Sequence, residues 1–259
     1  MTSLLHETDT RGVTTLTLNR PERYNAFDDN LIEALIEALD KVDRDDGVRI
    51  LLLRASGKHF CAGADLNWMQ RTADYSDEEN RADALQLANL LDRLNRLSKP
   101  VIGVVQGATY GGGIGLIACC DIAMAYDESV FCLSEVRLGL VPATIAPYVI
   151  AAIGARAARR YMLSAEQFDA QQACRLGLVH EVAPPTDTEQ RLAAILDALL
   201  QGGPGAQATT KRLIARVTPL DDELIAATAD IIAERRASAE GREGLSAFFD
   251  KRKPDWNES

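Results

Sequence analysis

Hydrophobic and polar positions in the first third of the chain follow the order strand, helix, strand. Val13–Asn19 alternates threonine with apolar residues, which is the period-two pattern of a strand with one exposed face. After a turn at Pro21–Asn25, a helix is predicted to begin near Asp28 and Asp29. Its apolar positions recur at helical spacing: Leu31, Ile32, Leu35, Ile36, Leu39 and Val42. Val48–Leu53 is a continuous apolar run, as expected for a strand buried on both faces.

The same order recurs before the chain becomes helical. The charged helical stretch Asp77–Leu97 leads into the apolar strand Val101–Val105, a glycine-rich segment, a short helix through Cys120 and a strand region within Asp121–Cys132. Five helices are then predicted: Arg156–Leu163, Ala165–Leu176, Thr188–Leu200, Ala206–Arg216 and Asp222–Ser238. We therefore predict an α/β core over residues 1–195 and a helical region over residues 196–259. The many apolar positions of that region are expected to pack on the core or on another subunit.

Composition narrows the classes of function. The 259 residues are 47% hydrophobic and 25% charged, which is typical of a folded globular protein with a large core. The formal net charge of −10 argues against a nucleic-acid surface. Neither the five cysteines nor the three histidines have the spacing of zinc ligands, so we expect free thiols, no metal and a cytoplasmic location. The N-terminus lacks a signal-peptide pattern, and the long uncharged stretches are interrupted by glycine, proline or polar residues, so no membrane span is expected.

Small residues follow the second predicted strand, in the segment Phe60–Leu66 (FCAGADL). Small residues just past a strand let a ligand approach the backbone closely, and they leave amides such as that of Ala64 free to donate hydrogen bonds. A tight turn between a strand and a helix would use the same residues without any ligand. By itself this segment supports both interpretations.

Glycines also follow the strand Val101–Val105, in the segment Gln106–Gly115 (QGATYGGGIG). A strand that runs into glycines at the start of a helix presents unpaired amides and a partial positive charge, which suits an anion or an oxyanion. The segment matches neither GxGxxG with its ribose-binding acid nor GxxxxGK[ST], because no lysine follows the glycines. A dinucleotide or nucleoside triphosphate site is therefore disfavoured.

A lone glutamate, Glu135, stands in the apolar segment Leu133–Pro142 (LSEVRLGLVP). One interpretation is a structural ion pair with Arg137. The other is an acid/base group in a cleft, where burial would raise its pKa toward neutrality.

In their order and spacing, these three segments resemble the crotonase (enoyl-CoA hydratase/isomerase) superfamily, and the resemblance extends from Asn19-Arg20-Pro21 to the helical tail. It implies an α/β fold built as a spiral of ββα units. It also implies that the C-terminal helical region mediates trimers, often paired as hexamers. The ligand would be an acyl-CoA thioester, with no separate cofactor because coenzyme A is part of the substrate.

The resemblance also implies roles for individual residues. The amides of Ala64 and Gly112 would form an oxyanion hole, and Glu135 would be the acid/base. The expected contacts with the substrate are Arg23 and Ala26 near the adenosine, Ala62, Asp65 and Leu66 along the coenzyme A, and Gly111, Gly115 and Arg137 around the acyl group. Separately from these assignments, Phe248, Phe249 and Lys251 near the end of the chain are predicted close to a coenzyme A, either that of the same subunit or that of a neighbour. For the two phenylalanines, ordinary helix packing is the alternative interpretation.

Gly115 departs from the family pattern. Hydratases of the family usually carry two glutamates, and the first of them falls at this position, two residues after the glycine triplet. A single glutamate resembles the double-bond isomerases of the family. We expect Gly115 to leave room for a bulky or carboxylated acyl group beside Glu135. The substrate's own carboxylate, or water in that space, would then replace the missing glutamate, and Arg137 could bind the carboxylate.

The runs HFCAGADLNWMQ and CLSEVRLGLVPATIAPYV look most like hydratases of methylglutaconyl-CoA and isohexenylglutaconyl-CoA, from leucine or acyclic-isoprenoid breakdown. The leading hypothesis is therefore hydration of such an ester, and the alternative is a Δ3,Δ2-enoyl-CoA isomerase. From other classes, the alternatives are a catalytically inactive acyl-CoA binder and an RNA-associating relative. The presence of Glu135 argues against the former, and the net charge of −10 argues against the latter.

Overall fold

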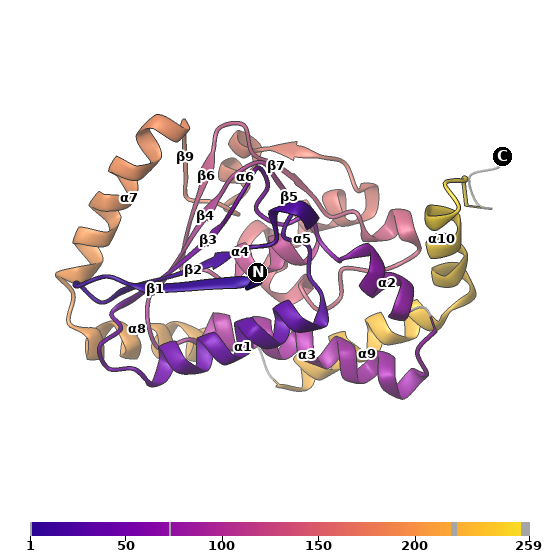
Figure 1. The fold of residues 1–259 in the computed structure, drawn as a ribbon, viewed down its shortest axis with the longest axis horizontal. Helices are drawn as coiled ribbons and strands as arrows, with labels where there is room; N and C mark the ends of the chain where they lie inside the picture. Colours follow the sequence, from indigo (N-terminus) through magenta and orange to yellow (C-terminus); the bar gives the residue numbers. More distant parts are fainter. Residues whose placement is uncertain (1, 73, 219–221, 255–259) are drawn as a thin grey trace.

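A six-stranded sheet forms the centre of the molecule in the computed structural model, which describes residues 2–72, 74–218 and 222–254 (Figure 1). In spatial order its strands are β1 (Leu4–Thr8), β2 (Val13–Leu18), β3 (Ile50–Ala55), β4 (Val101–Val105), β6 (Ile122–Tyr126) and β9 (Glu181–Ala183). β1 pairs with β2 in antiparallel fashion, and the remaining neighbours are parallel. Parallel strands leave their carboxyl ends at one edge, which is where the segments singled out in the sequence follow β3 and β4.

A second, three-stranded sheet lies beside this edge. It contains β5 (Ala108–Tyr110), β7 (Val130–Cys132) and β8 (Phe168–Asp169), with β7 in the middle. A single bridge between Cys61 and Thr109 joins the segment after β3 to β5. The small sheet therefore holds the segments that follow β3, β4 and β6 next to one another.

Helices cover both faces of the large sheet. The helices are α1 (Asp29–Arg44), α2 (Leu66–Thr72), α3 (Asp77–Arg96), α4 (Gly112–Ala118), α5 (Ala146–Ser164), α6 (Ala170–Leu176), α7 (Pro185–Leu200), α8 (Pro204–Val217), α9 (Asp222–Ala237) and α10 (Ala239–Phe249), with the 3-10 turns η1 (Pro21–Arg23) and η2 (Glu135–Leu138). On β3, Leu51 and Leu53 join the core formed with α1 and α3, whereas Ile50 and Leu52 pack with α7 on the opposite face. This alternation follows from the period of two along a strand.

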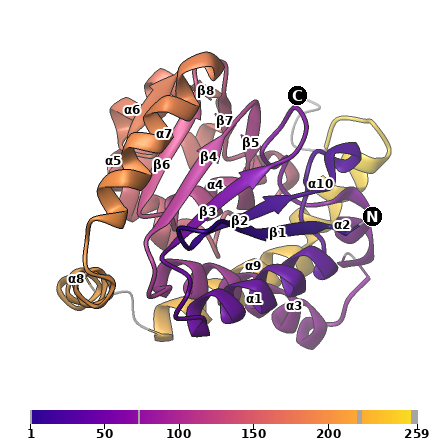
Figure 2. The same ribbon diagram turned by 60° about the vertical axis from the view of Figure 1, so that its left-hand side comes forward.

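The C-terminal helices return to the body of the molecule. α9 packs along α3, and α10 lies next to η2, whereas α8 stands at the periphery (Figure 2). The α10 backbone approaches η2 so closely that a Cβ on Gly244 would lie 2.3 Å from the Leu138 carbonyl oxygen. The predicted boundary after residue 195 falls inside α7, and the division into core and oligomerisation region stays a prediction.

Most of the predicted elements are confirmed. The helix predicted near Asp28 begins at Asp29, with the Asp28 carboxylate accepting a hydrogen bond from the Leu31 amide (2.9 Å). The single helix predicted over Ala165–Leu176 is wrong, because that range contains the strand β8 before α6 begins at Ala170. β1, β5, β9, α2 and α10 were not predicted from the sequence.

Within the ranges that the structure describes, no helix combines the length and the apolar character needed to cross a membrane.

Candidate active site

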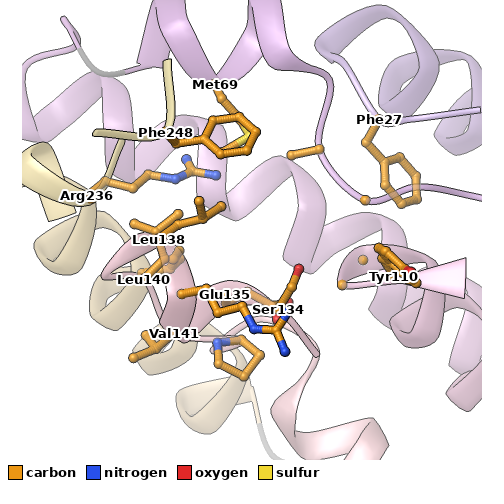
Figure 3. A pocket seen from close by; sticks show the side chains of 18 of the residues that line it. Phe27, Met69, Tyr110, Ser134, Glu135, Leu138, Leu140, Val141, Arg236 and Phe248 are labelled. Carbon is orange, nitrogen blue, oxygen red and sulfur yellow. The ribbon is translucent and has the colours of Figure 1, made fainter. Parts of the chain in front are cut away.

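A cavity of about 490 Å³ lies where the three segments singled out in the sequence meet helices from the C-terminal part of the chain. In Figure 3, Glu135 lies between Tyr110 on one side and Arg236 on the other. Most of the wall is apolar: Phe27, Leu66, Met69, Ala84, Leu87, Leu138, Leu140, Val141, Ile145, Ile232 and Phe248. Among the described lining residues, Glu135 is the one carboxylate. An apolar cavity with a few polar groups is the usual form of a small-molecule site.

The backbone amide of Ala64 is available at this cavity. Phe27 N–H donates to the Gly63 carbonyl (2.7 Å), and Asp65 N–H donates to the Phe27 carbonyl (2.7 Å). These two bonds form a parallel bridge opposite Ala64, so the N–H of Ala64 itself points away from Phe27. Ala64 lines the cavity, and its amide has no acceptor within the described residues. The loop thus presents a donor held by flanking hydrogen bonds.

Gly112 contributes a second available amide. It is the first residue of α4, so its N–H precedes the internal hydrogen bonds of the helix. The preceding residue, Gly111, has φ 49° and ψ −118°, a conformation that residues with a Cβ rarely adopt. A Cβ on Gly111 would also lie 3.1 Å from Glu135 Oε1, so glycine lets the carboxyl group approach the start of α4. The second donor therefore lies beside the carboxyl group.

Glu135 begins η2, and only Leu133 and Ser134 separate it from the end of β7. Its Oε2 is buried and has no hydrogen-bond partner in the described part of the chain. This burial raises the pKa of Glu135 to about 7. A carboxyl group with such a pKa can accept or release a proton near neutral pH, as general acid–base catalysis requires. The structure thus combines one acid/base group with two available amides.

The profile of the enoyl-CoA hydratase/isomerase family matches residues 8–259 of this sequence. The chain belongs to the enoyl-CoA hydratase/isomerase family.

Relatives cover nearly the whole chain. The crystal structure of an enoyl-CoA hydratase from Shewanella pealeana is 46% identical, with a TM-score of 0.81, and the match covers 98% of this chain and 96% of that chain. A 1,2-epoxyphenylacetyl-CoA isomerase of Escherichia coli is 36% identical over 95% of each chain. A 2,3-dehydroadipyl-CoA hydratase of Escherichia coli is 31% identical over 93% of each chain. The expected crotonase-type α/β fold is confirmed, and the relatives include both hydratases and isomerases.

Seven of the residues that the resemblance assigned line the cavity of this family member: Ala62, Ala64, Leu66, Gly111, Gly112, Glu135 and Arg137. Arg137 is exposed, and its Nη2 donates to the carbonyl of Ala165 (2.5 Å). The alternative interpretation, an ion pair between Glu135 and Arg137, does not form among the described residues, so Glu135 is not held in a structural role by that arginine. The contacts of these residues with a ligand stay predictions.

Arg23, Ala26 and Asp65 do not line the cavity. Arg23 is exposed and Ala26 is buried, and their expected contact with the adenosine stays a prediction. The buried Asp65 carboxylate accepts hydrogen bonds from Arg20 Nη2 (3.1 Å) and from the backbone amide of Asn67 (2.9 Å). Asp65 therefore holds the start of α2, and its expected contact with the coenzyme A stays a prediction.

The expectation that Gly115 leaves room beside Glu135 is wrong. A Cβ at Gly115 would lie 2.4 Å from Ile145 Cγ2, 3.0 Å from Ile145 Cβ and 3.4 Å from Leu91 Cδ2. Glycine is needed here because α4 packs closely against α3 and the start of α5. Ile145, which lines the cavity, occupies the space beside Gly115 that was expected to be open.

Phe248 of α10 lines the cavity, whereas Phe249 and Lys251 do not. Phe249 packs edge-to-face on Phe248, with ring centroids 5.6 Å apart. Their expected proximity to a coenzyme A stays a prediction.

Gln167 and Arg236 line the cavity and were not identified from the sequence. Gln167 Nε2 donates a hydrogen bond to the hydroxyl oxygen of Tyr110 (2.5 Å), and Arg236 reaches the cavity from α9. Gln167 and Arg236 belong to no motif around the site. They reach it because β8 and α9 pack against distant segments, so no local signal could have indicated them.

Proposed function

We propose that this member of the family adds water to an α,β-unsaturated acyl-CoA thioester. The observation that carries the proposal is the position of Glu135. Its carboxyl group, with Oε2 buried and a pKa of about 7, lies at a cavity that also contains the available amides of Ala64 and Gly112.

The proposed roles follow from the charges that develop during hydration. When water adds to the β carbon, the thioester oxygen takes on the negative charge of an enolate, and the amides of Ala64 and Gly112 donate hydrogen bonds to it. One such donor is typically worth ~10²–10³ in rate. Glu135 accepts the proton that leaves the water and returns it to the α carbon on the same face. The proposed reaction needs no metal or redox cofactor, because it involves only proton transfer and the addition of water to the double bond.

We further propose that the acyl group is of the branched glutaconyl type, as in 3-methylglutaconyl-CoA or isohexenylglutaconyl-CoA. The support is the similarity of the segments HFCAGADLNWMQ and CLSEVRLGLVP to such hydratases. In addition, a relative is named for 2,3-dehydroadipyl-CoA, which is also a thioester of a dicarboxylic acid. The largely apolar cavity would accept the branched carbon skeleton.

The second candidate is a Δ3,Δ2-enoyl-CoA isomerase. The observation that favours it is that Glu135 is the one carboxylate among the described lining residues. At position 115, where hydratases of the family carry the other glutamate, a glycine packs against Ile145. A single carboxylate can move a proton from C2 to C4 of a 3-enoyl thioester through an enolate held by the same two amides. The relative named as an isomerase of 1,2-epoxyphenylacetyl-CoA is in keeping with a site that isomerises.

Absorbance of the conjugated thioester distinguishes the two candidates. The purified enzyme is mixed with crotonyl-CoA, 3-methylglutaconyl-CoA and a 3-enoyl-CoA in separate reactions. We expect the signal to fall with 3-methylglutaconyl-CoA and to fall more slowly with crotonyl-CoA. A rise with the 3-enoyl ester and no fall with the others would establish the isomerase instead. No change with any of them would contradict both candidates.

We also propose that the protein is a trimer or a hexamer. α8 has no buried residue within the described chain, and it exposes Leu213, Ile214 and Val217 by 58%, 56% and 67%. Apolar positions of this kind on one helix commonly mark a protein interface. We expect light scattering to give a mass three or six times 28.2 kDa at micromolar concentration, and a stable monomer would contradict the proposal.

A further inference from the structure

Arg236 places a positive charge in the apolar end of the cavity. It comes from α9, and its side chain is only 12% exposed. In Figure 3 it lies beside Leu138 and Phe248, on the side of Glu135 that is opposite to Tyr110. Burying a guanidinium among apolar side chains is costly unless its donors are satisfied.

The partners of Arg236 satisfy only some of the N–H donors of its guanidinium group. Its Nη1 donates to Asp83 Oδ2 (2.7 Å), and the group lies over the ring of Trp68 at 5.5 Å. Trp68 Nε1 in turn donates to Asp83 Oδ1 (2.9 Å). In the described part of the chain, Nε and Nη2 of Arg236 have no acceptor. Arginine has five N–H donors in a planar fork that matches a carboxylate, so donors remain for a ligand.

Asp83 and Trp68 also fix the direction of the guanidinium. One carboxylate holds Nη1, and the indole supports the face of the group, so little rotamer freedom is left to lose when a ligand binds. An ion pair that only holds α9 on α3 would not need to face the cavity. Arg81 and Asp230 already form such a pair between these two helices; both side chains are about half exposed, and neither lines the cavity.

We propose that Arg236 binds the distal carboxylate of the acyl group, and that it makes the site selective for thioesters of dicarboxylic acids. This inference rests on the proposed function, since it specifies the acyl end of the same cavity. It assigns the carboxylate to Arg236 and not to Arg137, because Arg137 is exposed and donates to the Ala165 carbonyl.

The test compares saturated thioesters that bind without reacting and differ only in the terminal group. These pairs are glutaryl-CoA with pentanoyl-CoA, and adipyl-CoA with hexanoyl-CoA. For wild type we expect calorimetry to give a lower Kd for the dicarboxylic member of at least one pair. In Arg236→Gln this preference should fall ~10-fold or more, since a hydrogen-bonded charge pair is commonly of that size. A preference that is unchanged in this variant would overturn the inference.

The variant Asp83→Asn tests whether Arg236 binds the ligand or only holds α9 on α3 through its ion pair with Asp83. Asparagine keeps an acceptor for Trp68 but removes a negative charge next to the incoming carboxylate. If Arg236 binds the ligand, this change should raise the dicarboxylic preference about threefold or more. If the pair serves only to hold α9 on α3, both variants break it and should change the preference in the same direction. That result would overturn the inference.

Two further variants complete the experiment. Arg81→Gln breaks the other ion pair between α3 and α9, and we expect it to leave the preference as in wild type. Arg236→Lys keeps the charge without the planar fork, and its preference should lie between those of wild type and Arg236→Gln. Where the glutamine variant does not fold, Arg236→Lys and Asp83→Asn must still shift the preference in opposite directions.

Failure of every thioester to bind would overturn the proposed function together with the inference, whereas equal binding within each pair would overturn only the inference.

Discussion

Replacing Glu135 by glutamine is expected to lower kcat by ~10² or more while acyl-CoA binding and the fold are retained. The amide has nearly the shape of the carboxyl group but cannot accept the proton of water or return it, and general acid–base catalysis typically contributes this much. Steady-state kinetics with the best substrate of the panel measures the loss. Turnover within a few-fold of wild type would show that another group is the main acid/base.

The pH dependence provides a second measure of the role of Glu135. In the hydration direction the carboxylate form is active, so kcat/KM of the wild type should fall about tenfold per pH unit below pH 7 and level off above it. The pKa of Glu135 is higher in the folded protein than in the unfolded chain, so this group favours folding most at low pH. That contribution is lost as pH rises through about 7.

The glutamine at position 135 cannot ionise, so the free energy of unfolding of the variant at pH 8 should exceed that of wild type by on the order of 2 kcal/mol. The difference should shrink toward pH 4. Urea denaturation at the two pH values measures it. Glu128→Gln is the matched control, because Glu128 is exposed in the turn before β7, and it should change neither activity nor the pH dependence of stability.

Introducing a glutamate at position 115 is expected to destabilise the protein by about 2 kcal/mol or more. The Cβ alone would lie 2.4 Å from Ile145 Cγ2, and the carboxylate would enter a tightly packed layer between α4 and α5. Gly115→Glu should therefore reduce the turnover of crotonyl-CoA and 3-methylglutaconyl-CoA together. A stable variant that gains crotonyl-CoA hydration would show that the cavity extends to residue 115 after all.

Shortening Ile145 tests the same packing from the other side. Ile145→Ala removes Cγ2, so Gly115→Glu combined with Ile145→Ala should recover part of the stability that the single substitution loses. Because Ile145 lines the cavity, the new carboxylate can then approach Glu135. We expect the ratio of kcat/KM for crotonyl-CoA to that for 3-methylglutaconyl-CoA to rise in the double variant and not in the single one. Gly115→Ala is the control for size without charge, and Ile145→Ala should relieve it as well.

The sequence by itself determined the elements whose pattern is local. The stripe from Leu31 to Val42, with Asp28 as cap, gave a helix because periodicity and capping depend on neighbours three or four residues apart. The same holds for the amide of Gly112, since glycines that start a helix leave their N–H groups unpaired wherever the helix packs. The family likewise followed from three short segments and their order.

The tertiary structure decided which groups meet across long separations. Asp65 is paired with Arg20, Ile145 fills the space beside Gly115, and Arg236 reaches the cavity from α9 near the other end of the chain. Each of these contacts depends on how two elements pack, and a one-residue shift in either would change it without altering any local pattern. The motifs and the family resemblance therefore indicated Glu135 and its two amides, whereas the size and charge of the acyl pocket follow from the packing of α4, α5 and α9 around them.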